Sequence, residues 1–321
     1  MPTAYKSPFL RWRNLLIAVL LLFALYVLVP QLSVFSSSWH LLSQARLSWL
    51  VLAIIATLLT YFFAALTYCL LAFYRLHYLE VVTVEFAAML INRLLPAGVG
   101  ALGANYTYLR HRQHNTTQAA TVIAVNNILG LFGHFLIVVF IIVSSSAANQ
   151  KLILSSERHG LGVLWLVLTI VLMILCIAFV VARHRVLMLL RNIALQLRNY
   201  SKRPLRILAA LISSMLLTSA NIFCFHFCAN ALGVHLSLIA TVIIFTIGLS
   251  AGTVTPTPGG LGGFEAGLVA AFLVYGVASS PALAIALLYR LVSYWLMLVF
   301  GASAFMICVR RQLFQMTMPL A

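Results

Sequence analysis

Two short motifs of proline and glycine interrupt long apolar stretches of this chain. Residues 96–100 read PAGVG, and residues 258–262 read PGGLG. Proline removes a backbone N–H donor and glycine weakens a helix, so a helix that enters either motif must break there. Inside a bilayer such a break survives only where protein groups or a water-filled cavity satisfy the freed backbone. Matched breaks in two halves of a membrane chain are typical of transporter binding sites.

The composition indicates a polytopic membrane protein. Of the 321 residues, 64% are hydrophobic, 7% are charged, and none is aspartate. A soluble domain carries about 25% charged residues, so this chain cannot cover a water-facing surface. Its apolar segments recur at about the 20-residue length that spans a bilayer. They are 14–34, 49–74, 81–109, 117–143, 161–182, 207–229, 238–276 and 282–309.

The basic residues orient these segments. The formal charge of +16 comes from Lys and Arg that flank apolar segments, without a basic stripe interleaved with aromatics. This pattern favours the positive-inside rule over nucleic-acid binding. Basic residues at the N-terminus, in the loop 183–206 and after the last segment place all three in the cytoplasm. The broken segments 81–109 and 238–276 must then each return to the side from which they start.

We therefore predict an all-α fold of about six full transmembrane helices and two re-entrant broken hairpins, with both termini cytoplasmic. If both broken segments crossed fully, the basic loop 183–206 would lie outside, against the positive-inside rule. One hairpin enters from the inside and the other from the outside, which is an inverted-topology repeat. The repeat divides a single transmembrane domain, 1–321, into halves at 1–145 and 146–321.

Three charged residues are predicted to lie at membrane depth in these apolar segments. Glu265 is the acid that we place well inside the membrane, Arg290 lies midway along the last segment, and Arg93 precedes the first break. Such a charge costs about 2.5–3.5 kcal/mol on insertion scales, so it pairs or lines water. In one interpretation the arginines bind a phosphate, and Glu265 holds an arginine or exchanges a proton. In the other, Glu265 and Arg290 form a purely structural ion pair.

The two motifs complete the set of candidate substrate-binding residues. Asn127 lies 31 residues after Pro96 and Arg290 lies 32 after Pro258, so the helix after each hairpin carries a polar group at a corresponding place. Without that correspondence, each asparagine would be interpreted as an interhelical hydrogen-bonding group. The candidate residues are Arg290, Glu265, Arg93, Pro258, Gly259, Gly260, Gly262, Pro96, Gly98, Gly100, Asn126 and Asn127.

Two further groups of polar residues have simpler interpretations. Thr253, Thr255 and Thr257 precede Pro258, and we expect them to help satisfy the backbone around the break. His111 and His114 lie in a basic loop, where we expect solvated contact with lipid headgroups.

Enzyme signatures are absent from the sequence. It contains no Gly-x-Ser-x-Gly elbow, no Gly-x-x-x-x-Gly-Lys phosphate loop and no His-Glu-x-x-His motif. With no aspartate and four glutamates, it offers no credible carboxylate pair or metal cluster. We therefore predict no catalytic activity, no metal and no cofactor, and any transport would be secondary or passive.

The second motif carries a family resemblance. Residues 256–266 read PTPGGLGGFEA, followed by LYR at 288–290 and YW at 294–295. The pattern resembles the lysylphosphatidylglycerol synthase transmembrane-domain family, whose best-known member is the lipid-flipping part of the bacterial multiple peptide resistance factor. The resemblance implies that lipid moves between leaflets. It also implies that the characteristic positions are Pro258, Gly260, Gly262, Glu265 and Arg290.

The first half departs from the family pattern. Gly98 and Gly100-Ala101 stand where many relatives carry an arginine and a Gly-Glu pair, and Asn126-Asn127 stands where they carry a Glu-Arg pair. Half of the usual intramembrane charge is therefore missing, which bears on the substrate and on proton coupling. The soluble aminoacyl-transferase domain of larger relatives has no counterpart in this sequence, so we expect no lysyl transfer.

These patterns predict a flippase-like translocase of an anionic phospholipid or a polyprenyl-phosphate-linked lipid. We expect it in the bacterial inner membrane, with membrane lipids rather than nucleic acid as its partners. The alternative function is a non-transporting scaffold or regulator of an envelope-lipid or glycan synthesis enzyme. In that case the broken hairpins serve only to pack.

Overall fold

The computed structural model describes residues 43–95, 99–144, 200, 203–255 and 257–314. Every regular element in these residues is a helix. Four helices are long and apolar enough to cross a membrane. Three of them are α2 (Leu47–Leu71), α5 (Thr116–Val143) and α7 (Pro204–Ala231). The fourth runs through Ser279–Arg310.

The fourth long helix has three parts. It consists of α10 (Ser279–Arg290), a π-helical turn η3 (Leu291–Trp295) and α11 (Leu296–Arg310). A π turn inside an α-helix is rare and frequently lies at a functional site. The sequence predicts an apolar segment at 282–309 but gives no signal of this turn.

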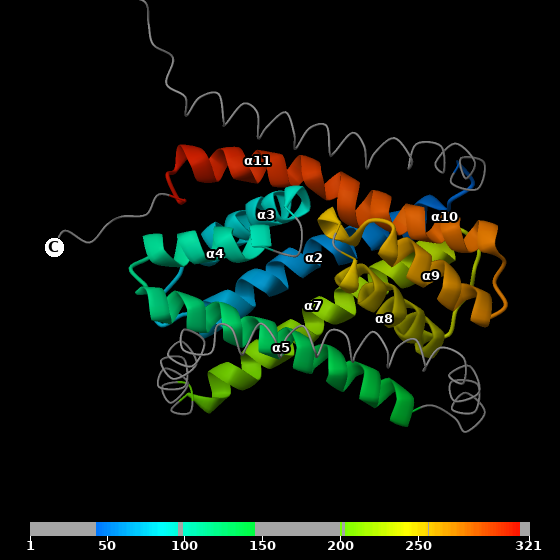
Figure 1. The fold of residues 1–321 in the computed structure, drawn as a ribbon, viewed down its shortest axis with the longest axis horizontal. Helices are drawn as coiled ribbons and strands as arrows, with labels where there is room; N and C mark the ends of the chain where they lie inside the picture. Colours follow the sequence, from blue (N-terminus) through cyan, green and yellow to red (C-terminus); the bar gives the residue numbers. More distant parts are fainter. Residues whose placement is uncertain (1–42, 96–98, 145–199, 201–202, 256, 315–321) are drawn as a thin grey trace, which may run out of the picture.

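The remaining helices form two hairpins. The first pairs α3 (Tyr78–Leu94) with α4 (Val99–His111). The second pairs α8 (Leu238–Val254) with α9 (Gly263–Val274), joined through a short 3-10 turn η2 (Pro258–Gly260). In Figure 1 the first hairpin opens toward the left end of the molecule and the second toward the right end. The end of α3, the start of α4 and the tip of the second hairpin therefore lie toward the middle.

The predicted segments coincide with these elements wherever the structure describes them. The segments 49–74, 117–143, 207–229 and 282–309 are the four long helices, and 81–109 and 238–276 are the two hairpins. The expected spans 14–34 and 161–182 lie outside the described residues, as does most of the basic loop 183–206. The prediction of an all-helical chain with several apolar helices is confirmed for the described residues.

Two hydrophobic cores hold the helices together, and α2 and α7 contribute to both. The first half of α2, from Ala53 to Ala56, packs with α7, α8, α9 and α10. Its second half, from Ala65 to Leu71, packs with α3, α4, α5 and α11. The hydroxyl of Ser213 on α7 donates to the carbonyl of Phe63 on α2 over 2.9 Å, which fastens the two central helices. Small and hydroxyl side chains at such crossings let helix backbones approach closely.

The last helix packs along the first hairpin. A Cβ added at Gly301 of α11 would lie 3.0 Å from the carbonyl oxygen of Phe86 on α3. Glycine therefore permits the close approach of α11 to α3.

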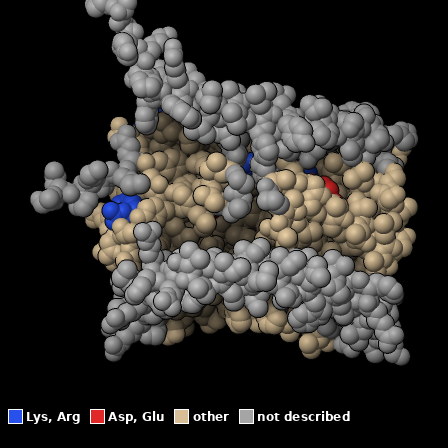
Figure 2. Space-filling view, in the orientation of Figure 1, with Lys and Arg blue, Asp and Glu red and all other residues tan. Residues whose placement is uncertain are grey.

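The outward face of the described helices is apolar. Large hydrophobic side chains point outward from several of them, among them Leu47 on α2, Leu131 on α5 and Leu205 on α7. Among the described residues, Lys, Arg, Asp and Glu atoms occupy little of the face in Figure 2, which is hollowed near its centre. Apolar exposure on this scale fits contact with lipid tails rather than water.

Candidate functional site

The tip of the second hairpin is built from left-handed glycines. Gly259, Gly260 and Gly262 have φ angles of 64°, 65° and 86°, which residues with a Cβ rarely adopt. A Cβ at Gly260 would lie 2.5 Å from the carbonyl oxygen of Gly252 on α8. The tip therefore requires glycine both for its backbone angles and for its close contact with α8.

Threonines satisfy the backbone around this tip, as the sequence predicts. The hydroxyl of Thr257 donates to the carbonyl of Leu261 over 2.8 Å, across the turn. The hydroxyls of Thr253 and Thr255 donate back to the carbonyls of Leu249 and Ala251, near the end of α8. The prediction is confirmed for Thr255 and Thr257, whereas Thr253 bonds a carbonyl that lies before the last turn of α8.

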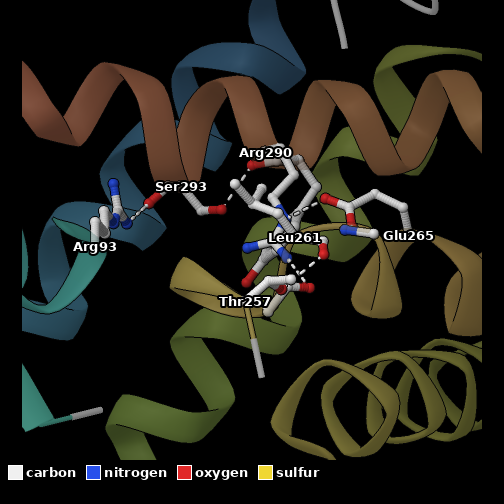
Figure 3. Close-up of polar contacts among 9 residues, drawn as sticks. Arg93, Thr257, Leu261, Glu265, Arg290 and Ser293 are labelled. Atoms are coloured by element: carbon white, nitrogen blue, oxygen red, sulfur yellow. Dashed lines mark hydrogen bonds and ion pairs between the residues drawn. The ribbon is translucent and has the colours of Figure 1, made fainter. Parts of the chain in front are cut away.

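Glu265 joins the tip to the last long helix. One carboxylate oxygen accepts a 2.7 Å hydrogen bond from the backbone N–H of Gly262 and thereby caps the N-terminus of α9. The other oxygen accepts a 2.7 Å hydrogen bond from Nε of Arg290. Figure 3 shows the two side chains meeting beside the tip. Both oxygens of this carboxylate are therefore occupied.

Arg290 lies over the tip. Its Nη2 donates to the carbonyl of Gly260 over 3.3 Å, and its guanidinium carbon lies 4.4 Å from the centre of the Phe264 ring. Arg290 and Glu265 are 8% and 9% exposed. The predicted ion pair is present, and it is buried.

Arg93 reaches the same region from the first hairpin. Near the end of α3, its guanidinium donates to the backbone carbonyls of Ser293 and Tyr294 in the π turn. Its guanidinium carbon lies 4.3 Å from the centre of the Tyr294 ring, while that of Arg290 lies 5.6 Å from the same ring. Two arginines from opposite halves of the chain thus lie near one aromatic ring.

A cavity of about 600 Å³ lies between the two hairpins. Arg93 and Arg290 line it, together with the glycine tip. Its volume is in the range of small-ligand sites, about 300–1,000 Å³. Helices α2, α3, α7 and α8, the segment that follows α8 and the π turn supply further polar lining: Thr57, Thr60, Tyr61, Glu85, Asn92, Asn221, Thr253, Thr255, Thr257 and Ser293.

The structure brings part of the predicted set to this cavity. Arg93, Arg290, Gly259 and Gly260 line it. Glu265 binds Arg290, and Gly262 is the N-cap residue of α9, whose backbone N–H donates to Glu265. Pro258 begins the 3-10 turn.

Other predicted residues lie elsewhere. Gly100 lies where α4 crosses α3, and a Cβ there would be 2.5 Å from the backbone of Ile91. Asn126 is half-buried on α5 and Asn127 is exposed, and neither lines the cavity. The spacing that matched Asn127 with Arg290 does not bring them to one site. Pro96 and Gly98 lie outside the described residues.

Sequence reasoning missed a second acid at the cavity. Glu85 lies on α3, in the first broken segment, and lines the cavity together with Met89 and Asn92. These positions, at i, i+4 and i+7, share one helical face. A polar–Met–polar face of this kind was the signal that could have identified Glu85.

His114 also departs from the prediction. It is 1% exposed rather than solvated. Its Nε2 accepts from the N–H of Phe73 over 3.2 Å, and its Nδ1 lies 3.1 Å from the carbonyl of Arg112. These partners assign the proton to Nδ1 of a neutral ring. Burial lowers the pKa of His114 below its ordinary value.

Comparison with known proteins bears on the whole chain. A family model described as "Lysylphosphatidylglycerol synthase TM region" matches residues 13–301. The chain is also similar to a protein of Methanothermobacter thermautotrophicus described as a UPF0104 membrane protein, with 38% identity over 72 residues. That match covers 22% of this chain and 22% of the relative.

Proposed function

Because the chain belongs to the family of lysylphosphatidylglycerol synthase transmembrane regions, we propose that it moves an anionic lipid headgroup between the two leaflets of a membrane. It is an integral membrane protein. The observation that carries the proposal is the polar cavity between two apolar hairpins, with Arg93 and Arg290 in its wall. A dry scaffold has no need for two buried guanidinium groups beside a space of this size.

The arginines keep hydrogen-bond capacity for a phosphate. A guanidinium has five N–H donors, and the described contacts of Arg290 use two of them, to Glu265 and Gly260. The two described hydrogen bonds of Arg93 likewise use two donors. The unused donors suit the oxygens of a phosphodiester or pyrophosphate. Lipid tails would stay in the bilayer, against the exposed apolar side chains of the helices.

The arrangement of the hairpins suggests how a headgroup crosses. We infer that both are re-entrant, one from each side of the membrane, and that the halves form an inverted repeat. Small movements of one half against the other would then open the cavity to one leaflet at a time. Arg93 joins the halves, since it lies on α3 and donates to the π turn of the last helix.

The proposal includes the cellular setting. We propose a non-enzymatic, secondary or passive translocase in the bacterial inner membrane, whose cargo is an anionic phospholipid or a polyprenyl-phosphate-linked lipid. A translocase needs a cavity that water can enter. The alternative, a scaffold with an envelope-synthesis enzyme as partner, predicts a dry cavity.

Lipid translocation in proteoliposomes tests the function. The full chain is reconstituted with fluorescent phosphatidylglycerol, and the outer-leaflet probe is bleached by a membrane-impermeant reductant. We expect faster translocation than in empty vesicles, and slower translocation with Arg290→Ala or Arg93→Ala. A wild-type rate equal to that of empty vesicles would contradict the function. Normal transport by both folded variants would show that translocation does not require the two arginines.

Cysteine accessibility separates a translocase from a scaffold. In a cysteine-free background, Thr253→Cys and Asn92→Cys place thiols in the cavity wall, and Leu131→Cys places one on the exposed apolar face of α5. We expect aqueous thiol reagents to label the first two and to leave the third unmodified. No labelling at either cavity position would support the scaffold function.

A further inference from the structure

Glu85 has an unsatisfied carboxyl oxygen at the cavity. Its Oε1 is buried and has no hydrogen-bond partner among the described residues. Buried polar atoms are nearly always paired, so each exception calls for an explanation. Because the side chain lines the cavity, a group that enters the cavity can reach it.

Among the described residues, no cation forms an ion pair with Glu85. From α2, the titratable groups that face it are Tyr61, Tyr68 and Cys69. From α4, the neutral side chain of Asn105 faces it. On its own helix the basic residue is Arg93, eight residues further on and therefore about 12 Å away along the axis. The other acid of this helix, Glu80, pairs with Arg112. The Arg93 guanidinium is engaged by the carbonyls of the π turn.

The other acid of the site, Glu265, has a partner for each of its carboxylate oxygens. Glu265 uses one oxygen to cap α9 and the other to bind Arg290. Protonating it would weaken both contacts, so its charge is tied to the fold. Glu85 caps no helix, and among the described residues it enters no ion pair. A carboxylate buried without a partner is costly, and binding a proton removes that cost.

We propose that Glu85 is the proton-binding group that couples a proton to headgroup binding in the cavity. A proton passes from hydronium in the cavity to the carboxylate oxygen of Glu85, forms an O–H bond and leaves a water molecule behind. The acid becomes neutral. This inference rests on the proposed translocase function and supplies its driving force.

The charges around the cavity explain the coupling. Arg93 and Arg290 carry one positive charge each, and Glu265 cancels one of them. When Glu85 is ionised it cancels the other, so the site as a whole is neutral. When Glu85 is protonated, one positive charge is left for a phosphate. Headgroup and proton therefore bind together and leave together, and each raises the affinity for the other.

The protonation itself is tested without any transport. Infrared spectra of the full chain in detergent are recorded over a pH series, and the carboxylic-acid C=O band is followed. We expect the wild-type spectrum minus that of Glu85→Gln to contain a band that grows as the pH falls. The wild-type spectrum minus that of Glu265→Gln should lack this band. Glu85→Asp, which keeps an acid at the position, should give the band at a shifted frequency. Identical carboxylic-acid bands in the wild type and folded Glu85→Gln across the pH series overturn the proposal.

The coupling is tested in vesicles of phosphatidylethanolamine and phosphatidylglycerol that contain a fluorescent phosphatidylglycerol probe. An imposed gradient of one pH unit should change the ratio of inward to outward translocation by up to about tenfold for one coupled proton. Glu85→Gln should translocate with no response to the gradient. A response that survives in Glu85→Gln, or one driven by sodium instead of protons, overturns the proposal.

The two experiments separate this inference from the function on which it rests. A wild-type chain that shows the Glu85 band but moves no lipid would contradict the translocase and the coupling, while leaving the proton site established. A chain that moves lipid without a Glu85 band or a response to the gradient would retain the translocase and lose only the proton.

Discussion

The two hairpins differ in the partners that their charged side chains bind. The second neutralises its acid within its own half, where Glu265 is bound by Gly262 and Arg290. The first binds its arginine to the other half, through the carbonyls of the π turn, and leaves an oxygen of Glu85 unsatisfied. The second hairpin is therefore built as a fixed wall of the site. The first carries the contacts that can change.

The strongest way to break this comparison is to remove Arg290. Arg290→Ala leaves the carboxylate of Glu265 buried without its cation, and loss of one partner of a buried pair costs about 3–5 kcal/mol. We expect a large drop in the thermal unfolding temperature in detergent. The double variant Arg290→Met with Glu265→Leu should recover much of the loss, because both charges are then gone. A single variant as stable as the wild type would show that the pair is not what holds the second hairpin.

Glycine substitutions test whether the backbone of the second hairpin is more tightly constrained than that of the first. Gly260→Ala combines a left-handed backbone with a contact of 2.5 Å to Gly252, so we expect a loss of about 2–4 kcal/mol. The matched control is Gly103→Ala in α4, where a Cβ meets nothing within 4 Å. It should be neutral or stabilise the helix by up to about 1 kcal/mol. Equal melting temperatures for the two variants would contradict the tight second tip.

Arg93→Lys tests the bond between the halves. An ammonium lacks the planar fork that lets Arg93 donate to two adjacent carbonyls while lying on the Tyr294 ring. We expect a stability loss of about 1–2 kcal/mol, smaller than that of Arg290→Ala. The translocation rate should change more than the melting temperature, since the contact joins parts that we propose to move. A rate that follows stability alone would make Arg93 a purely structural residue.

The smallest effect concerns the base of the first hairpin. His114 is buried in its neutral form, and burial lowers its pKa below the ordinary value of about 6.5. As the pH falls below 6.5 the unfolded chain binds the proton first, so the folded state loses stability from there down through the folded-state pKa. Melting temperatures across this window should decline less steeply in His114→Gln than in the wild type. Parallel declines would assign the acid sensitivity to other groups.

The sequence predicted most of the fold and half of the site. Apolar length and the Pro/Gly breaks located every described helix, because those signals depend on the bilayer alone. Arg93, Arg290 and Glu265 were found because charges in apolar segments are costly and hence informative. Asn126 and Asn127 were placed by repeat spacing, which fixes a position along a helix but not the face on which it lies.

The features that the sequence did not predict depend on contacts between distant segments. Glu85 lies near the start of its segment, and only the packing of α2 and α4 around it shows that it is embedded rather than at the surface. His114 is buried because the loop after α2 folds over it through the backbone of Phe73. Neither contact follows from local spacing.

The π turn sets the rotational phase of the last helix. An α-helix turns by about 100° per residue, so in a regular helix Arg290 and Gly301, eleven residues apart, would face within about 20° of the same direction. The wider turn at Leu291–Trp295 changes the angle between these two directions. Arg290 contacts the second hairpin, and Gly301 packs against the first. Converting the turn to regular α-helix without changing the number of residues would bring Arg290 and Gly301 back to within about 20° of one direction, and the last helix could then fit only one of the hairpins.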